Sequence, residues 1–591
     1  MRRPVPAVRL ALIALILSGW FVGCARVKVA EVRPEAAARA VRHVLGEHPL
    51  GQPRNLGPTW VTGDDPHTLR AGIDLEAARH REVFSRDEAI RLYAQSMEMA
   101  WRAIENPASP DRDRAVAIYN RALDRFLRIA GGHRFRFGPA WFRELEGRGI
   151  HLTVRRDASV WDPARFEELR FPGDFVSCGM ANYYGANGLG VPLIAVRNTP
   201  EDQLPRRRGP DRFAPYFEVY PVTAILRFSG PGASPTVPLL ELHDPLRFGQ
   251  VPTAGGPLTM AADLTTPTAY HFARGRLTLY ERLSLFTPQR VARETGLHML
   301  HPYEPGKIPV VLIHGLGSSP LAWGRVVNEL RGDPALRARY QFWIYMYPTG
   351  IPFLLSAADL RRELVEARAS VDPSGADPAF DQMVLVGHSM GGLLSKLLIT
   401  ESGEDLWSLN SREPFERMSA SSEHRDLLAR VFFFQPLGFV RRVVFIATPH
   451  RGSRLGSELI GRLGDRLIRI PGPLAEAHAA LIDGNPPEFF TPEFLQGVPS
   501  SIDELTFENP YLLAIDRLPR APWVVAHSII GRVGRGSLEE SSDGVVPYTS
   551  SHVDWAASET IIDRMHFLQD DPLTIEELRR ILRLHLSESG G

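Results

Sequence analysis

The sequence lacks an excess of charge of either sign. Its 68 lysine and arginine residues equal its 68 aspartate and glutamate residues, so the formal net charge is zero. Without a basic surplus the chain offers no bulk electrostatic attraction to nucleic acid, and we expect no nucleic-acid partner. The 591 residues are too many for one ordinary domain, and we expect roughly two or three.

Cysteine is also scarce, with Cys24 and Cys178 the only two in the chain. Cys24 ends a segment, 1–24, that has the features of a signal peptide, because arginines precede an apolar run from Leu10 to Val22. The run is short for a membrane-spanning helix, which needs roughly 20 residues. We therefore expect residues 1–24 to direct export of the chain.

The end of this segment, Phe21-Val22-Gly23-Cys24, resembles a bacterial lipobox. The resemblance implies that cleavage leaves a diacylglyceryl-modified Cys24 as the first residue of an envelope lipoprotein, on the periplasmic or outer-membrane side. Phe21 departs from the leucine that is usual at its position, and an uncleaved membrane anchor remains the alternative. Both interpretations place the rest of the chain outside the cytoplasm and attached to a membrane.

Cys178 is the other cysteine. If Cys24 carries lipid, Cys178 has no partner, and the exported part of the chain contains no intramolecular disulfide. We expect Cys178 to be a small buried apolar residue without a catalytic role.

Two kinds of segment follow the predicted signal. Residues 25–84 are rich in proline, glycine and charge, and we expect a tether. Over 85–134 the pattern predicts a helical hairpin, because Ser85 and Glu88 have the spacing of a capping box and a later apolar stripe ends near Ala130. We expect this hairpin to pack against a neighbouring domain.

Residues 135–290 form a predicted β-rich accessory module. Short apolar runs such as Val191–Val196, Phe217–Phe228 and Val237–Leu242 alternate with breaks rich in glycine and proline. The sequence of this segment contains no metal-ligand cluster and no phosphate-loop motif. Our hypothesis is that the module narrows access to a site elsewhere in the chain or orients the protein at a membrane.

The strongest chemical signal is the sequence Gly-His-Ser-Met-Gly around Ser389. A buried strand is predicted over Gln382–Val386 and a helix over Leu393–Ile399, so Ser389 lies on a strand-to-helix turn. Gly387 and Gly391 leave room for that turn. A serine raised above a sheet in this way can meet a base, which makes Ser389 a candidate nucleophile.

Four further motifs accompany the serine motif in the expected order: Val310–Gly317, Ala447–Ser453, Ser542–Pro547 and Met565–Phe567. With these motifs, the region from about 300 to the C-terminus resembles an α/β-hydrolase of the bacterial lipase/esterase type. The resemblance implies a mostly parallel sheet with helices on both faces, in a catalytic domain over 291–591.

The alternation of apolar strands and helices agrees with that sheet. Active sites in such sheets form beyond the carboxyl ends of the strands, which is where the motifs fall. The first strands of the family are less clear and are expected within 276–303. The later candidate strands are Ile308–Ile313, Gln341–Met346, Gln382–Val386, Val443–Ala447, Trp523–Ile530 and Thr560–Asp563.

The resemblance also implies a catalytic triad in the chain order serine, acid, histidine. Asp543 follows the strand that begins at Trp523, and His566 follows the next strand, so both have the expected position. His552 is an alternative base, but it precedes the last strand. Asp554 or Asp563 could replace Asp543, and three further histidines are expected to be structural neighbours of the site: His314, His388 and His450.

By position in the family, the oxyanion hole would be formed by the backbone N–H groups of Leu316 and Met390. The implied mechanism is acyl transfer through an acyl-Ser389 enzyme, with His566 as the base. It requires no organic cofactor and no catalytic metal. A structural calcium occurs in some lipases of this type, but no ligands for it can be assigned in this sequence.

A long insertion over about 403–440 contains Trp407, Phe415 and the run Phe432–Phe434. Insertions above the sheet form lids in the family, and an apolar cluster there suggests a surface for an acyl chain. Packing of these aromatics in the core is the alternative. A second stretch, 454–510, is also expected above the strand ends.

Together these features predict an exported, membrane-attached serine hydrolase that cleaves carboxylic esters of lipids or of other apolar acyl groups. An acyltransferase that uses the same acyl-enzyme is one alternative, which product analysis with added glycerol or lysolipid would detect. A catalytically silent envelope scaffold is another. The complete set of triad residues argues against the scaffold.

Overall fold

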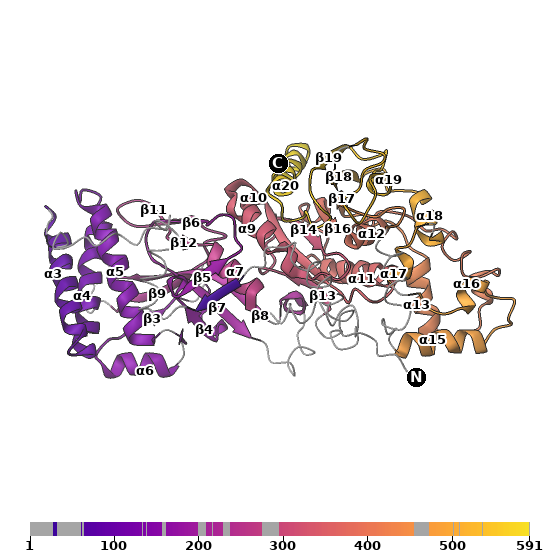
Figure 1. Ribbon diagram of the computed structural model, residues 1–591. Coiled ribbons are helices and arrows are strands. Elements are labelled where there is room, and N and C mark those ends of the chain that lie inside the picture. The colour runs from indigo at the N-terminus through magenta and orange to yellow at the C-terminus, as the bar shows by residue number, and fades with distance from the viewer. Residues whose placement is uncertain are drawn as a thin grey trace, which may run out of the picture.

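The computed structural model describes most of the chain, and its elements form an elongated molecule with two bodies (Figure 1). The predicted signal peptide, with Cys24, lies outside the described residues. Within the described part, no helix has the length and apolar composition needed to cross a bilayer. The described residues are 28–31, 61, 64–132, 134–136, 139–155, 161–198, 209–215, 217–228, 237–274, 295–453, 472–499, 501–507, 509–534 and 536–589.

Three helices form one end of the molecule: α3 (Pro66–Glu82), α4 (Arg86–Glu105) and α5 (Arg112–Gly131). The two helices of the predicted hairpin are confirmed as α4 and α5. Ser85 caps α4 by accepting a hydrogen bond from the amide of Glu88 at 3.3 Å. The reciprocal half of the capping box does not form, because the Ser85 amide donates to the carbonyl of Arg81 instead, at 2.7 Å.

The prediction of a tether over 25–84 is wrong for residues 66–82, which form α3. Asp65 caps this helix by accepting a hydrogen bond from the Thr68 amide at 2.8 Å, and Pro66 occupies the first turn, where a missing N–H costs nothing. The buried stripe of α3 packs on α4 and contains small residues such as Ala71 and Ala78 beside Leu75. Small side chains give a weak periodic signal, which is why the sequence resembles a tether.

The accessory module contains a six-stranded sheet with the order β2-β4-β7-β8-β9-β3. The three predicted apolar runs are confirmed as strands β7, β8 and β9. Helix α6 (Pro139–Gly147) follows β2, and helix α7 (Thr265–Arg274) contacts β8. The strands of the sheet are β2 (Arg134–Phe135), β3 (Thr153–Val154), β4 (Glu168–Arg170), β7 (Val191–Asn198), β8 (Phe217–Arg227) and β9 (Leu239–His243).

Three smaller strand pairs accompany this sheet. They are β1 (Lys28–Glu31) with β5 (Phe175–Cys178), β6 (Gly185–Ala186) with β12 (Ala262–Asp263), and β10 (Gln250–Val251) with β11 (Leu258–Thr259). The first pair corrects the expectation that Cys178 is buried, because its side chain is exposed. Side chains alternate along a strand, so Phe175 and Ser177 face inward and Cys178, the last residue of β5, faces outward.

The second body is built on a seven-stranded sheet with the order β13-β15-β14-β16-β17-β18-β19. All neighbours pair in parallel except the edge strand β13, which is antiparallel to β15. The mostly parallel sheet predicted for this region is therefore confirmed. Its strands are β13 (Gly296–Met299), β14 (Ile308–Ile313), β15 (Tyr340–Met346), β16 (Met383–His388), β17 (Val440–Ile446), β18 (Val525–Gly531) and β19 (Ser558–Ile562).

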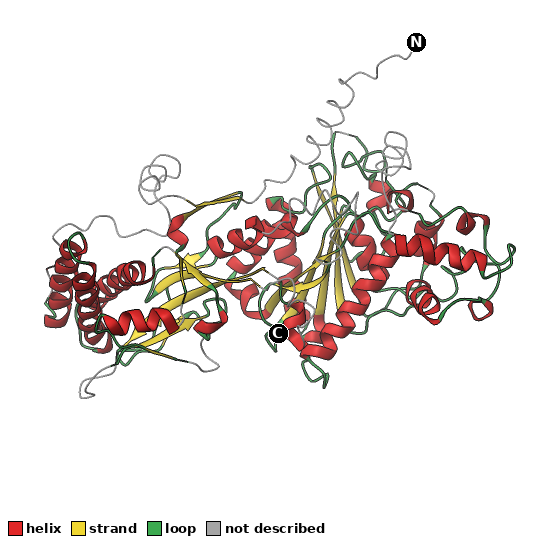
Figure 2. Ribbon diagram, turned by 90° about the horizontal axis from the view of Figure 1, so that it is seen from below, coloured by secondary structure: helices red, strands yellow, loops and turns green. Residues whose placement is uncertain are grey.

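Helices cover both faces of this sheet (Figure 2). Helices α9 (Gly324–Gly332) and α20 (Pro572–Glu588) share one apolar cluster with Val310 and Leu312 of β14. Helices α11 (Phe353–Val371) and α12 (Met390–Leu397) share another with the alternate β14 residues Val311 and Ile313. Each central strand is therefore buried on both sides, which explains its continuous apolar sequence.

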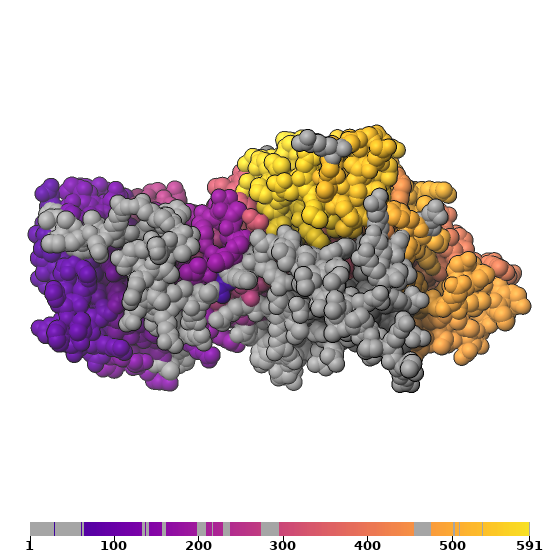
Figure 3. All heavy atoms as spheres, in the orientation of Figure 1, coloured from indigo at the N-terminus to yellow at the C-terminus, as the bar shows by residue number. Residues whose placement is uncertain are grey.

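The remaining helices of this body are short or lie in the insertions. Helices α15 and α16 form the end of the molecule opposite α3, α4 and α5 (Figures 1 and 3). The bounds are α10 (Pro334–Arg339), α13 (Ser422–Phe432), α15 (Gly472–Asp483), α16 (Pro492–Leu495), α17 (Ser501–Glu504), α18 (Pro510–Arg517) and α19 (Tyr548–Ser551).

The aromatic residues of the insertion over 403–440 pack in the core. Trp407 is 2% exposed, and its ring lies 5.1 Å from that of Phe415 and 6.0 Å from that of Phe432. Trp407 and Phe432 belong to the apolar cluster that includes residues of α11 and α12, and Phe415 packs against it. Of the two interpretations of this cluster, its burial therefore supports core packing over an exposed surface for an acyl chain.

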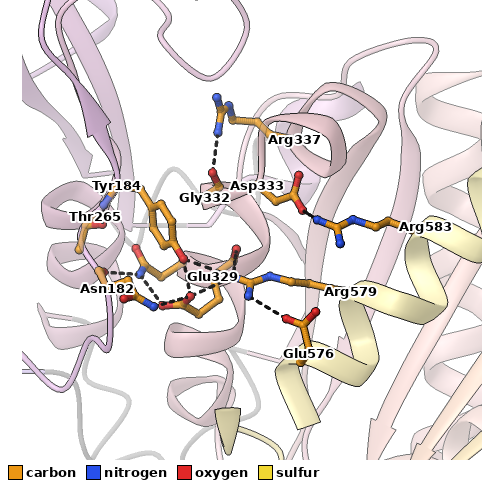
Figure 4. A network of polar contacts seen from close by, with 11 residues as sticks. Asn182, Tyr184, Thr265, Glu329, Gly332, Asp333, Arg337, Glu576, Arg579 and Arg583 are labelled. Carbon is orange, nitrogen blue, oxygen red and sulfur yellow. Dashed lines mark hydrogen bonds and ion pairs between the residues drawn. The ribbon is translucent and has the colours of Figure 1, made fainter. Parts of the chain in front are cut away.

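A buried polar network joins the two bodies (Figure 4). Glu329 of α9 accepts hydrogen bonds from Asn182 and Tyr184 of the accessory module and from Arg579 of α20. Gly332 is required at this junction, because a Cβ atom there would lie about 2.5 Å from the ring of Tyr184. The module is thus fixed to two helices of the second body, α9 and α20.

Candidate active site

Ser389 lies at the sharp turn between β16 and α12, as the sequence predicts. Its backbone has φ 53° and ψ −125°, a conformation that residues other than glycine rarely adopt. The residue is 5% exposed. Such strain persists only where the surrounding structure holds it, and at this position it raises the hydroxyl above the carboxyl ends of the strands.

Ser389, His566 and Asp543 form one hydrogen-bonded chain. His566 Nε2 lies 2.9 Å from Ser389 Oγ, and His566 Nδ1 lies 2.7 Å from Asp543 Oδ2. An aspartate carboxylate can only accept, so Nδ1 carries the proton and Nε2 is left to accept from the serine hydroxyl. The fold therefore brings together the three residues named from the sequence, although they lie far apart in the chain.

Backbone contacts fix the acid of this chain in place. Asp543 Oδ1 accepts hydrogen bonds from the amides of Val545 and Val546, at 2.8 and 2.7 Å. Burial raises the pKa of Asp543, but its interaction and hydrogen bond with His566, together with the two backbone hydrogen bonds, outweigh burial, and the net pKa is below the ordinary value. Asp543 is therefore ionised at neutral pH and can stabilise an imidazolium.

The alternative residues make other contacts. His552 hydrogen-bonds Asp554 and Glu559, at 2.8 and 2.6 Å. Asp554 is 91% exposed, and Asp563 pairs with Arg532 at the surface. Among the described contacts none of these groups reaches Ser389 or His566, which favours Asp543 as the acid and His566 as the base.

Three further histidines lie buried in the motifs of the site. Burial lowers the pKa of His314 to about 4 and that of His388 to about 3, and it lowers the pKa of His450 well below its ordinary value. All three are uncharged at neutral pH. His388 Nε2 lies 3.0 Å from the backbone carbonyl of His566, so its imidazole supports the histidine loop. They are structural neighbours of the site, as expected.

The two residues expected to supply oxyanion donors lie beside Ser389. Met390 is the first residue of α12, where helix amides have no partner within the helix. Leu316 lies in the turn after β14, and this turn approaches Ser389 closely, because a Cβ atom on Gly315 would lie 2.8 Å from Ser389 Cβ. Both expected donors are therefore close to the serine.

Several residues of the site carry no sequence motif. Tyr347 and Thr349 follow β15 and hydrogen-bond the turn that contains Leu316. Gly531 ends β18, and a Cβ atom there would lie 2.8 Å from Asp543 Cβ. The only available signal was their position just beyond the carboxyl ends of strands. Among the described residues, no group of three or more histidine, cysteine, aspartate or glutamate side chains could hold a metal ion.

Residues 310–585, just under half of the chain, match the model of the Alpha/beta hydrolase family. Bacillus licheniformis lipase BlEst2 in its mature form is 19% identical, with 48% of this chain and 95% of that chain covered and a TM-score of 0.29. A lipase-esterase related protein from Clostridium acetobutylicum is 13% identical, with 48% and 98% covered and a TM-score of 0.25. Esterase B from Lactobacillus rhamnosis is 14% identical, with 49% and 79% covered and a TM-score of 0.26.

No curated protein matches the sequence significantly. The family match and the strand order together identify the fold of the C-terminal body as that of an α/β-hydrolase.

Proposed function

We propose that this protein is a serine hydrolase that cleaves carboxylic esters through an acyl-Ser389 intermediate. The observation that carries the proposal is the buried chain of hydrogen bonds from Ser389 through His566 to Asp543. A nucleophile, a base and a group that orients the base are the parts that acyl transfer requires.

In acylation, Ser389 Oγ bonds to the ester carbonyl carbon while its proton moves to His566 Nε2. The carbonyl oxygen becomes an oxyanion. When the intermediate collapses, the bond to the alcohol oxygen breaks and His566 returns the proton to that oxygen. The alcohol leaves, and the acyl group remains on Ser389.

In deacylation, water replaces the alcohol. His566 takes a proton from water, whose oxygen bonds to the acyl carbon, and then returns the proton to Ser389 Oγ as the acid leaves. In both half-reactions Asp543 holds His566 in the required tautomer and stabilises its charge. The amides of Leu316 and Met390 are the proposed donors to the oxyanion.

The substrates are proposed to be neutral, apolar acyl esters. The buried histidines of the neighbouring motifs, His314, His388 and His450, are uncharged at neutral pH, which suits an ester better than an anionic substrate. The signal and lipobox-like sequence support an exported protein attached to a membrane through Cys24. Lipid esters in that membrane are then within reach.

The test is hydrolysis of p-nitrophenyl esters, from acetyl to palmitoyl, by the protein lacking residues 1–24 and by its Ser389→Ala variant. We expect release of p-nitrophenol by the first protein only, and the chain-length profile separates an esterase from a lipase. Absence of turnover on every ester, with detergent or lipid present, would refute the proposal. Formation of acylglycerol in the presence of glycerol would instead indicate an acyltransferase.

A further inference from the structure

The direction of a backbone amide is set by the peptide group that contains it. A trans peptide group is planar, and its C=O and N–H bonds point in opposite directions. The Leu316 N–H shares its group with the carbonyl of Gly315, and the Leu316 C=O shares the next group with the amide of Gly317. Contacts that hold these two groups therefore determine where the Leu316 N–H points.

The group that precedes Leu316 is held at its carbonyl. Gly315 O accepts from His314 Nδ1 at 3.1 Å and from the Ser318 amide at 3.3 Å. Because a carbonyl only accepts, His314 carries its proton on Nδ1. The Leu316 N–H, on the opposite side of the same group, is directed away from these donors.

Tyr347 holds His314 in turn. Its hydroxyl donates to the carbonyl of His314 at 2.7 Å, and its ring stacks on the imidazole with 4.5 Å between the ring centroids. Burial raises the pKa of Tyr347 above its ordinary value, so the hydroxyl remains a donor. Both the backbone and the side chain of His314 are thus fixed by one residue from the end of β15.

Thr349 holds the group that follows Leu316. Its Oγ1 accepts a hydrogen bond from the Gly317 amide at 3.2 Å, and Gly317 has a φ of +64°, which glycine adopts without strain. Thr349 is fully buried, and Ser501 of α17 donates to its carbonyl. The acceptor for Gly317 is therefore itself held in place from a second segment.

We propose that Tyr347 and Thr349 are positioning residues that aim the Leu316 N–H at the oxyanion formed during acyl transfer. This inference rests on the proposed function. Thr349 holds the peptide group that follows Leu316 directly, and Tyr347 holds the peptide group that precedes it through His314. Neither touches the reacting atoms, and both act through the backbone of the turn.

The expected effect is a loss of transition-state binding without a loss of substrate binding. Deleting an oxyanion donor typically costs about 10²–10³ in kcat. Thr349→Val keeps the shape of the side chain but leaves the Gly317 amide without an acceptor. Because the Leu316 donor remains and only its aim changes, we expect kcat to fall by on the order of tenfold, with KM unchanged.

Three variants with two matched controls test this. Thr349→Val and Tyr347→Phe remove the two hydroxyls, and Thr349→Ser restores one. Tyr345→Phe and Thr400→Val serve as controls, because Tyr345 donates to Ser356 and Thr400 to Lys396, away from the turn. The substrate is p-nitrophenyl butyrate.

A second measurement separates a change in the direction of the Leu316 N–H from a general disturbance of the site. Phenylboronic acid forms a bond from boron to Ser389 Oγ, the serine proton passes to His566, and the tetrahedral adduct resembles the intermediate. We expect its affinity to fall by the same factor as kcat/KM in Thr349→Val and Tyr347→Phe. Activity should recover in Thr349→Ser, and both controls should resemble the unchanged protein.

Unchanged kcat/KM and boronate affinity in Thr349→Val and Tyr347→Phe would overturn the inference. So would a fall in kcat without a matching fall in boronate affinity, or a fall of the same size in both controls. If a variant does not fold, the other still decides the question.

Failure of the proposed function is recognised separately by labelling with an alkyl fluorophosphonate. In that reaction a bond forms from Ser389 Oγ to phosphorus, fluoride leaves, and the serine proton passes to His566. It needs the serine and the oxyanion donors but no ester substrate. If no ester is hydrolysed but labelling occurs, slower labelling of Thr349→Val than of Thr400→Val supports the inference, and equal rates contradict it.

Discussion

The junction between the two bodies allows a matched comparison of two carboxylates on one arginine. Arg579 pairs with Glu329 and with Glu576, at 3.0 and 3.2 Å. The Glu329 side chain is 4% exposed and that of Glu576 is 62% exposed. Asn182, Tyr184 and Asn328 also donate to Glu329, so its carboxylate accepts from four residues (Figure 4).

Burial decides the size of the expected effects. Replacing one partner of a buried ion pair typically costs about 3–5 kcal/mol, because the other charge stays buried. Arg579 is 20% exposed, so water can partly solvate it, and we expect about 3 kcal/mol for Glu329→Gln. An exposed pair is typically worth less than about 1 kcal/mol, which is the limit we expect for Glu576→Gln.

Urea unfolding followed by tryptophan fluorescence measures both variants. We expect a clear shift of the unfolding midpoint to lower urea for Glu329→Gln and little shift for Glu576→Gln. A partial shift is expected for Tyr184→Phe, which removes one donor and keeps the pair. Equal shifts for the two glutamate variants would refute the reasoning, because burial would then not determine the strength of the pair.

Three further outcomes are expected. Asp543→Asn should lower kcat by about 10³–10⁴, because an amide no longer holds the His566 imidazole in the tautomer that accepts the serine proton. Steady-state kinetics should show this loss, while urea unfolding should show little change in stability. Burial lowers the pKa of His301, but Asp244 outweighs it and raises the pKa to about 9. The stability that this pair contributes is therefore full below pH 6.5 and is lost as the pH rises through about 9. In urea unfolding, His301→Gln should lower the free energy of unfolding at pH 6 and hardly change it at pH 10. A larger loss at pH 10 than at pH 6 would contradict the pair. Gly315→Ala should lower kcat by on the order of 10², because the added Cβ atom would lie 2.8 Å from Ser389 Cβ, and wild-type kinetics would contradict that contact.

The seven-stranded sheet could be predicted well from the sequence, because its central strands are buried on both faces. Burial on both sides requires continuous apolar residues, and β14 and β16 have that composition. Helix α3 could not be recognised in the same way. Apart from Leu75, its buried face consists of small or polar residues, which contribute little to a periodic pattern of apolar side chains.

The residues of the site also differ in how far the sequence predicts them. Ser389, Asp543 and His566 lie in motifs with a fixed order, so their meeting could be expected before the fold was known. Tyr347 and Thr349 have no motif, and their contacts depend on which strand lies beside β14. That neighbour is β15, which follows β14 in the chain and lies on the side away from β16. Contacts set by such pairing are available only from the three-dimensional structure.

The exposure of individual side chains was harder to predict than the pairing of strands. Cys178 was expected to be buried because cysteine usually is, but the end of β5 turns its side chain outward. For the aromatic residues of the insertion over 403–440, the sequence leaves two interpretations open, an acyl-chain surface and core packing. Only the packing of Trp407 and its neighbours decided between them.

The most direct test of the central claim is detection of the acyl group on Ser389. The protein is mixed with excess p-nitrophenyl butyrate, quenched in acid within milliseconds, digested and analysed by mass spectrometry. We expect a butyryl group on the peptide that contains Ser389, together with a burst of p-nitrophenol, and neither in His566→Ala. Turnover without any acyl group on that peptide, or an acyl group on a different residue, would contradict the account.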